Sequence, residues 1–182
     1  MHDRSTTSQE QGQQREQIAV LAERLYCRVR SLAVIAEATR AGIEQAHALL
    51  DSKVQSFPSA NRAIARETDR AEGYGALCRD LLSLMAFCRP GKAVQVPRCA
   101  ATTDPPMAQA QTKGIAMEGL RLLIDVRTWS NRQSSPLVTD AHAIGRELEQ
   151  LLREAHDPFL LSVADSITLV LHTPHGRAQE KS

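Results

Sequence analysis

Apolar side chains recur every three or four residues over positions 18–50, which is the spacing of one face of an amphipathic helix. The positions are Ile18, Leu21, Leu25, Val29, Leu32, Ile35 or Ala36, Ile43, Ala46 and Leu50. A helix of about 33 residues is roughly 50 Å long. Its own backbone hydrogen bonds do not stabilise such a helix in water, so the pattern predicts a bundle in which another helix or another chain covers this face.

A second helical pattern lies between two breaks in the chain. Ser56-Phe57-Pro58-Ser59 separates it from the first, with Ser59 as the N-cap, and Arg89-Pro90-Gly91 ends it, which predicts a helix over residues 60–88. Gly73-Tyr74-Gly75 predicts a kink within it. The two helices form an antiparallel hairpin with a second apolar surface, and pairing two such hairpins gives a four-helix bundle. We therefore expect a homodimer. The apolar positions of the second helix include Ile64, Ala71, Leu77, Leu81, Leu84 and Met85.

The pattern after residue 90 predicts a smaller unit that contains both helices and strands. Helical spacing is found at residues 108–126 and 140–155, β-like runs at 93–96, 159–163 and 167–171, and turn-rich or polar segments at 102–106 and 130–135. The predicted fold class is α+β and mostly helical. The predicted organisation is a disordered tail at residues 1–15, a helical hairpin at 16–90, an α/β domain at 91–172 and a polar tail at 173–182.

Composition bears on the fold class and on the expected partners and location of the protein. Aromatic residues make up only 3% of the 182 residues, which favours helix packing over a β-sandwich or barrel. The formal net charge of +1 gives no field that attracts nucleic acid or acidic lipid, so neither is an expected partner. Charges interrupt every apolar run, and residues 1–16 lack the apolar core of a signal peptide. We therefore expect no membrane span and a cytoplasmic protein.

The cysteines lack the short paired spacings of a zinc site, so no metal site is expected. Three of them stand in apolar contexts, where a cysteine is usually a small buried residue. Cys27 differs, because it lies about 200° around the helix from both Leu25 and Val29 and is predicted to face solvent or a partner. The neighbouring arginines can stabilise a thiolate there, which makes a redox role a minor alternative. The other three cysteines are Cys78, Cys88 and Cys99, and the arginines are Arg24, Arg28 and Arg30.

Residues 25–31 read Leu-Tyr-Cys-Arg-Val-Arg-Ser. This stretch resembles the phosphoacceptor box of HWE-type sensor histidine kinases, Leu-x-His-Arg-Val-Lys-Asn, with Cys27 at the acceptor position and Ser31 in place of the Asn. The resemblance extends over residues 18–170 in the order of helical hairpin, short strand, helix and closing strands. It implies a dimerising hairpin followed by a small, degenerate kinase-like ATPase domain of α/β type, with strands in part of residues 136–158.

The nucleotide motifs of that family are degraded in this chain. The box His-Glu-Leu-x-x-Asn is represented by residues 117–122, where only Glu118 matches and Leu122 cannot bind magnesium. Asp165 stands where an Asp-x-Gly-x-Gly box begins, but Ile167 replaces the first glycine and fills the space for the ligand. The resemblance therefore implies no nucleotide-binding site, no cofactor and no intact catalytic residue, with Glu118 either a residual base or an ordinary solvated helix residue.

The related histidine phosphotransferases share the hairpin and a degenerate second domain, but they keep the acceptor histidine that this chain lacks. The resemblance thus implies a catalytically silent two-component regulator that binds response-regulator receiver domains or partner kinases. Two alternatives stay open: an active phosphorelay phosphotransferase with another acceptor, and a helical dimer with a structural or transcription-regulatory role. The expected partner-binding residues are Arg24, Cys27, Arg28, Arg30 and Ser31.

Overall fold

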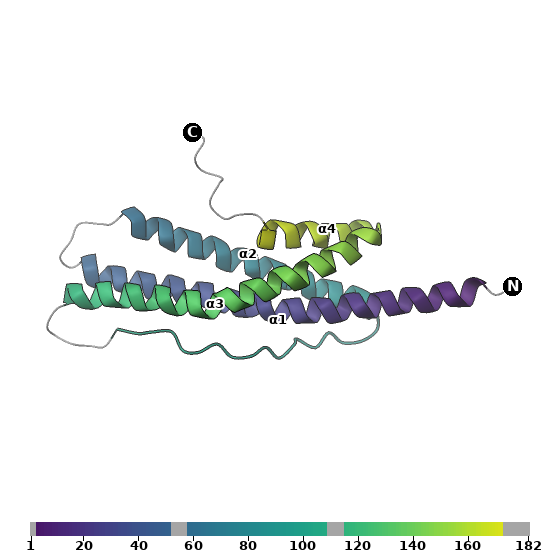
Figure 1. Cartoon of the computed structure of the whole chain (residues 1–182), viewed down its shortest axis with the longest axis horizontal. Helices are drawn as coiled ribbons and strands as arrows, with labels where there is room; N and C mark the ends of the chain where they lie inside the picture. Colours follow the sequence, from purple (N-terminus) through teal and green to yellow (C-terminus); the bar gives the residue numbers. More distant parts are fainter. Residues whose placement is uncertain (1–2, 52–57, 109–114, 173–182) are drawn as a thin grey trace, which may run out of the picture. The chain divides into compact units, whose positions relative to one another are not determined.

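The computed structural model describes residues 3–51, 58–108 and 115–172, and every regular element in these ranges is helical. The elements are α1 (Asp3–Asp51), α2 (Pro58–Cys88), α3 (Ile115–Glu154), α4 (Pro158–Ile167) and the π-helical turn η1 (Thr168–His172) (Figure 1). The prediction of a mostly helical chain is confirmed, whereas no β-strand occurs in the described ranges.

Helix α1 starts earlier than the apolar pattern indicates. The disordered tail predicted for residues 1–15 is wrong where it is described, because α1 begins at Asp3. Residues 3–14 are polar and have no apolar face of their own. Once the packed part of α1 exists, each further residue adds a hydrogen bond without a new nucleation cost, and the Gln and Glu residues here favour the helix.

The three predicted strands are not strands. Residues 93–96 have no regular structure, residues 159–163 belong to α4, and residues 167–171 span the end of α4 and η1. A short apolar run fits a buried strand and a buried helix equally well by periodicity alone. The local capping decides for the helix: the carboxylate of Asp157 accepts hydrogen bonds from the backbone N–H groups of Phe159 and Leu160 at 2.9 and 3.2 Å. Pro158 then occupies the first helical position, where its missing N–H costs nothing.

Residues 130–135, predicted as a polar linker between two helices, lie inside α3. The helix continues through Pro136, whose ring removes one backbone donor but does not end it. For residues 136–154 the sequence allowed either a helix or strands, and the structure has a helix there. The start of the helix predicted from residue 108 is also wrong for Ala108, which has no regular structure, and residues 109–114 lie outside the described ranges. Helix α2 runs without interruption through Gly73-Tyr74-Gly75.

The contacts divide the chain into two compact units. Unit 1 comprises residues 1–29, 76–98 and 139–182, and unit 2 comprises residues 30–75 and 99–138. Unit 1 contains segments from both sides of residue 90, where the sequence predicted a domain boundary. This division does not test that boundary, which remains a prediction.

In unit 1, α1 and α2 run antiparallel. The guanidinium of Arg15 lies 5.9 Å from the ring centroid of Phe87, and Arg89 Nη2 lies 2.6 Å from Glu16 Oε1. Helix α4 lies along the C-terminal part of α3, as Figure 1 shows. The core of unit 1 consists mainly of leucines, and all four helices contribute residues to it. Its large members with less than 2% exposure are Ile18, Leu25, Val29, Leu77, Leu81, Leu84, Leu148, Leu152 and Ile167.

In unit 2, α1, α2 and α3 share one apolar cluster. Its buried members come from α1 and α3, namely Ile43, Ala46, Leu122 and Val126, while Ala63 and Ile64 of α2 pack against them half-buried. In Figure 1, α1 and α2 run in opposite directions within each unit.

The two apolar faces that suggested a homodimer are covered within one chain. Leu32 is 3% exposed and Leu81 is fully buried. The homodimer remains a prediction, but these two residues no longer argue for it. None of the described helices is both long and apolar enough to cross a bilayer.

Candidate functional site

The motif of residues 25–31 lies in the middle of α1 and is helical throughout. Arg24, Cys27, Arg28 and Ser31 share one helix face by their spacing, whereas Arg30 lies off that face. The solvent exposure of these side chains decreases along the face: Arg24 is exposed, Cys27 and Arg28 are half-buried, and Ser31 is buried. Arg30 is exposed. The side chains available to a partner are therefore mainly the two outer arginines, Arg24 and Arg30.

Cys27 lies beside another part of the chain. Its Sγ is 3.8 Å from the carbonyl oxygen of Arg98, in the segment that follows α2 within unit 1. A thiol is a weak donor, so this contact is easily exchanged for another. The expectation that Cys27 faces solvent or a partner is met only in part, because the Arg98 backbone covers one side of the sulfur.

Arg28 has an intramolecular partner. Its Nε lies 3.1 Å from Asp140 Oδ2 of α3, within unit 1. Both side chains are substantially exposed, at 39% and 54%, so the pair contributes only about 0–1 kcal/mol to stability. A negatively charged partner can therefore compete with Asp140 for this guanidinium.

The residues that match the nucleotide motifs have packing roles. Leu122 belongs to the apolar cluster of unit 2, and Ile167 is fully buried in unit 1. Glu118 is half-buried in the first turn of α3, where a carboxylate interacts favourably with the helix dipole. Asp165 binds Arg153, with Oδ1 2.9 Å from Nη2. None of these contacts places a second catalytic group next to Glu118, so they do not support its interpretation as a residual base.

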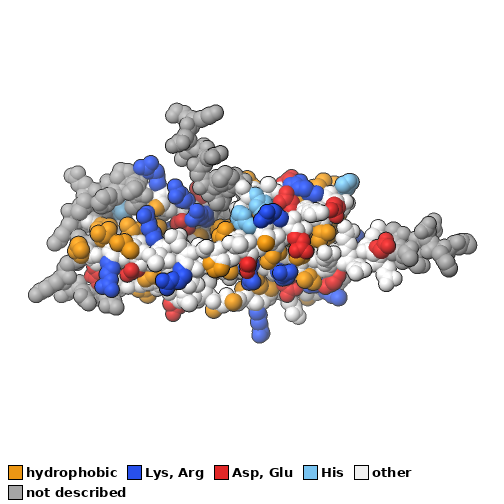
Figure 2. Space-filling view, viewed as in Figure 1, with side chains coloured by type: hydrophobic (Ala, Val, Ile, Leu, Met, Phe, Trp, Pro, Cys, Tyr) orange, Lys and Arg blue, Asp and Glu red, His pale blue; other side chains and the backbone are white. Residues whose placement is uncertain are grey.

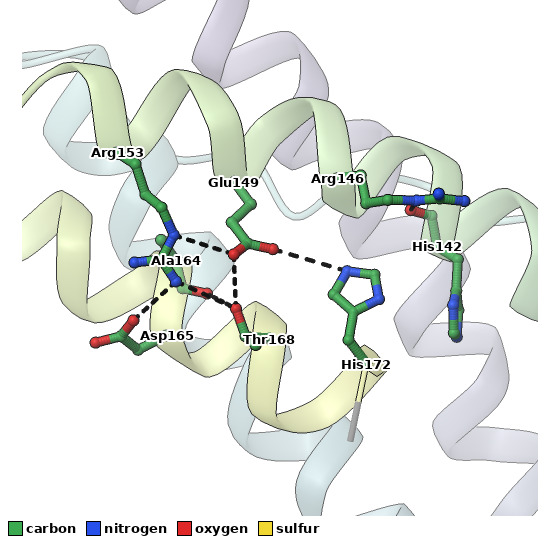
Figure 3. A network of polar contacts seen from close by, with 8 residues as sticks. All are labelled: His142, Arg146, Glu149, Arg153, Ala164, Asp165, Thr168 and His172. Carbon is green, nitrogen blue, oxygen red and sulfur yellow. Dashed lines mark hydrogen bonds and ion pairs between the residues drawn. The ribbon is translucent and has the colours of Figure 1, made fainter. Parts of the chain in front are cut away.

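A polar network that was not predicted from the sequence joins α4 and η1 to α3 (Figure 3). Glu149 Oε1 accepts from Arg153 Nε at 3.0 Å and from the Thr168 hydroxyl at 2.8 Å. Arg153 continues the network to Asp165 and lies 3.3 Å from the Thr168 hydroxyl. The Glu149–Arg153 pair has the visible spacing of a helix salt bridge, but its link to Thr168 depends on the turn between α3 and α4. The chain makes that turn at His156, which has a left-handed φ of 54°.

Two histidines extend the same network. The rings of His142 and His172 meet edge to face, with centroids 5.1 Å apart, and His172 Nε2 lies 3.8 Å from Glu149 Oε2 (Figure 3). Burial lowers the pKa of His142, and the neighbouring His172 and Arg146 lower it further. No group of three or more His, Cys, Asp or Glu side chains in the described ranges has a metal-binding arrangement. These contacts join α3 to α4 and η1.

The four cysteines are all thiols. Cys78 and Cys88 are buried in unit 1, as their apolar context predicts, and burial raises the pKa of the Cys88 thiol. Cys99 is only half-buried.

Comparisons of the chain with protein-family models, with curated proteins and with solved structures find no match.

Proposed function

We propose that this chain is a catalytically silent relative of the HWE-type kinases and phosphotransferases, a two-component regulator that binds the receiver domain of a response regulator. The observation that carries the proposal is the position of the phosphoacceptor-like motif on α1, in a helix that pairs antiparallel with α2. In this proposal, α3, α4 and η1 stand where the kinase family has its ATPase domain.

The charges of the α1 face support a receiver as the partner. Arg24 and Arg30 project into solvent, and Arg28 forms an exposed pair with Asp140. The aspartate pocket of a receiver is anionic, and guanidinium groups bind carboxylates and phosphates through paired, charge-assisted hydrogen bonds. On the face drawn in Figure 2, cationic and anionic side chains are interspersed, and the formal net charge of the chain is +1. Recognition in this proposal therefore depends on local pairs instead of a net field.

We expect the purified protein to bind at least one receiver domain encoded in the same genome, and to lose affinity when Arg24 and Arg30 are both replaced by Glu. Two reversed charges at one interface weaken binding by about tenfold or more. Biolayer interferometry at two salt concentrations measures the effect. Arg62→Glu, on an exposed position of α2, is the matched control and retains the native affinity. Absence of binding to every receiver contradicts the proposal, as does an equal loss in the control.

Replacing Cys27 by His tests the proposed phosphotransfer-like surface directly. The phosphoryl group of a receiver aspartyl phosphate passes to the imidazole nitrogen and the receiver carboxylate is regenerated, so no ATP is required. We expect Cys27→His to be labelled by a radiolabelled phosphoreceiver, while the native protein and Cys27→Gln are not labelled. None of the three forms is expected to be labelled by ATP. Equal labelling of the native and His forms contradicts a silent native protein.

A second candidate function is a helical dimer with a structural or regulatory role. Met117, Leu120 and Ile124 of α3 in unit 2 are exposed at 71%, 46% and 57% and recur at helical spacing. They form an apolar stripe that a second copy can cover, and this observation favours the dimer independently of the α1 motif. Light scattering at micromolar concentration measures the mass of the purified protein, and a monomeric mass contradicts the dimer.

A further inference from the structure

We propose that unit 2 binds a small phosphorylated polyol, of the size of a sugar phosphate, in a hollow between α1, α2 and α3. The hollow has a volume of about 370 Å³, which lies at the lower end of the range for small-molecule sites. All of its lining residues belong to unit 2. This site is separate in sequence from the α1 motif, and its existence does not depend on receiver binding.

The charge of the hollow selects an anion. Three guanidinium groups line it, from Arg66 and Arg70 of α2 and Arg127 of α3, against the single carboxylate of Glu67. Glu67 is already satisfied by Arg70, whose Nη1 lies 2.9 Å from its Oε1. Arg66 and Arg127 are exposed and form no ion pair with any residue in the described ranges. Two cations therefore remain for a ligand, and guanidinium groups bind phosphate oxygens in pairs.

The uncharged lining indicates what carries the phosphate. Arg127, Ser130, Asn131 and Ser134 follow one face of α3 at helical spacing, and all four line the hollow. Hydroxyl and amide groups both donate and accept, so this face can bind phosphate oxygens next to Arg127 and sugar hydroxyls further along. The apolar lining is limited to small areas, and no aromatic side chain is present to stack on a base. A polyol therefore fits better than a nucleotide or a lipid.

Isothermal titration calorimetry on the full chain at low salt tests the site with four probes: ribose 5-phosphate, inorganic phosphate, ribose and AMP. We expect ribose 5-phosphate to bind most tightly, inorganic phosphate more weakly, and ribose not at all. AMP is expected to bind no more tightly than ribose 5-phosphate. Tighter binding of AMP overturns the proposed ligand class, and equal binding of ribose overturns the anion site.

Matched arginine variants show whether binding occurs in this hollow. Arg127→Gln and Arg66→Gln each remove one unpaired charge from an exposed position and are expected to weaken ribose 5-phosphate binding by about tenfold. Arg121→Gln removes an equal charge from an 84% exposed position of α3 outside the hollow, and it should retain the native affinity. Failure of ribose 5-phosphate to bind at millimolar concentration overturns the proposal, as does equal weakening in Arg121→Gln.

Discussion

Replacing Leu81 by Ala is expected to lower the free energy of unfolding by about 2–5 kcal/mol. Leu81 is fully buried in the leucine-rich core of unit 1, so its truncation removes buried apolar surface and leaves a cavity. A loss of this size is a large fraction of the stability of an ordinary domain. Urea denaturation followed by circular dichroism measures it. The control is Leu169→Ala, because this side chain is 65% exposed and its removal should change stability by less than about 0.5 kcal/mol.

The same measurement tests whether one chain completes this core. If the core forms within a single chain, the urea midpoint of the native protein is independent of protein concentration. If a second copy supplies part of it, the midpoint rises with concentration, because association stabilises the folded state by mass action. A Leu81→Ala variant as stable as Leu169→Ala contradicts the burial of Leu81 within one chain.

The apolar pattern of α1 was predictable because large side chains at helical spacing must be covered. Every position of its stripe from Ile18 to Ala46 is buried. The structure also buries the small residues Ala19, Ala22 and Ala33 and the ring of Tyr26, which lie beside the stripe and widen the buried face. Alanines carry little signal in a hydrophobic pattern, so the sequence indicated a narrower covered face than α1 has.

The second half was harder to predict, since short apolar runs do not distinguish strand from helix. The run from Phe159 to Val163 becomes helical through the Asp157 cap and Pro158, both visible in the sequence, but the strand was predicted from the apolar run alone. The candidate site was likewise predictable only in part. Cationic residues around Cys27 could be found by helix spacing, whereas the contacts of Arg28 with Asp140 and of Cys27 with Arg98 join residues far apart in sequence.

Two glycines on long helices illustrate how packing reverses a local preference. Gly75 lies within α2, and a Cβ atom there would meet no heavy atom within 4 Å. Gly119 lies within α3 against α1 in unit 2, where a Cβ would be 2.9 Å from the backbone oxygen of Ala46 and 3.1 Å from Leu49 Cβ. Helix propensity alone favours replacement of either glycine by Ala, by up to about 1 kcal/mol.

We therefore expect opposite signs for Gly75→Ala and Gly119→Val. Gly75→Ala should raise the free energy of unfolding by about 0.5–1 kcal/mol, since it gains helix propensity and meets open space. Gly119→Val should lower it by about 1–3 kcal/mol, because a backbone oxygen cannot move aside without shifting α1. Gly119→Ala should fall between them, with the contact to Ala46 offsetting its propensity gain. Urea denaturation of the three variants measures the order, and a Gly119→Val protein at least as stable as the native one would show that α1 and α3 do not approach this closely.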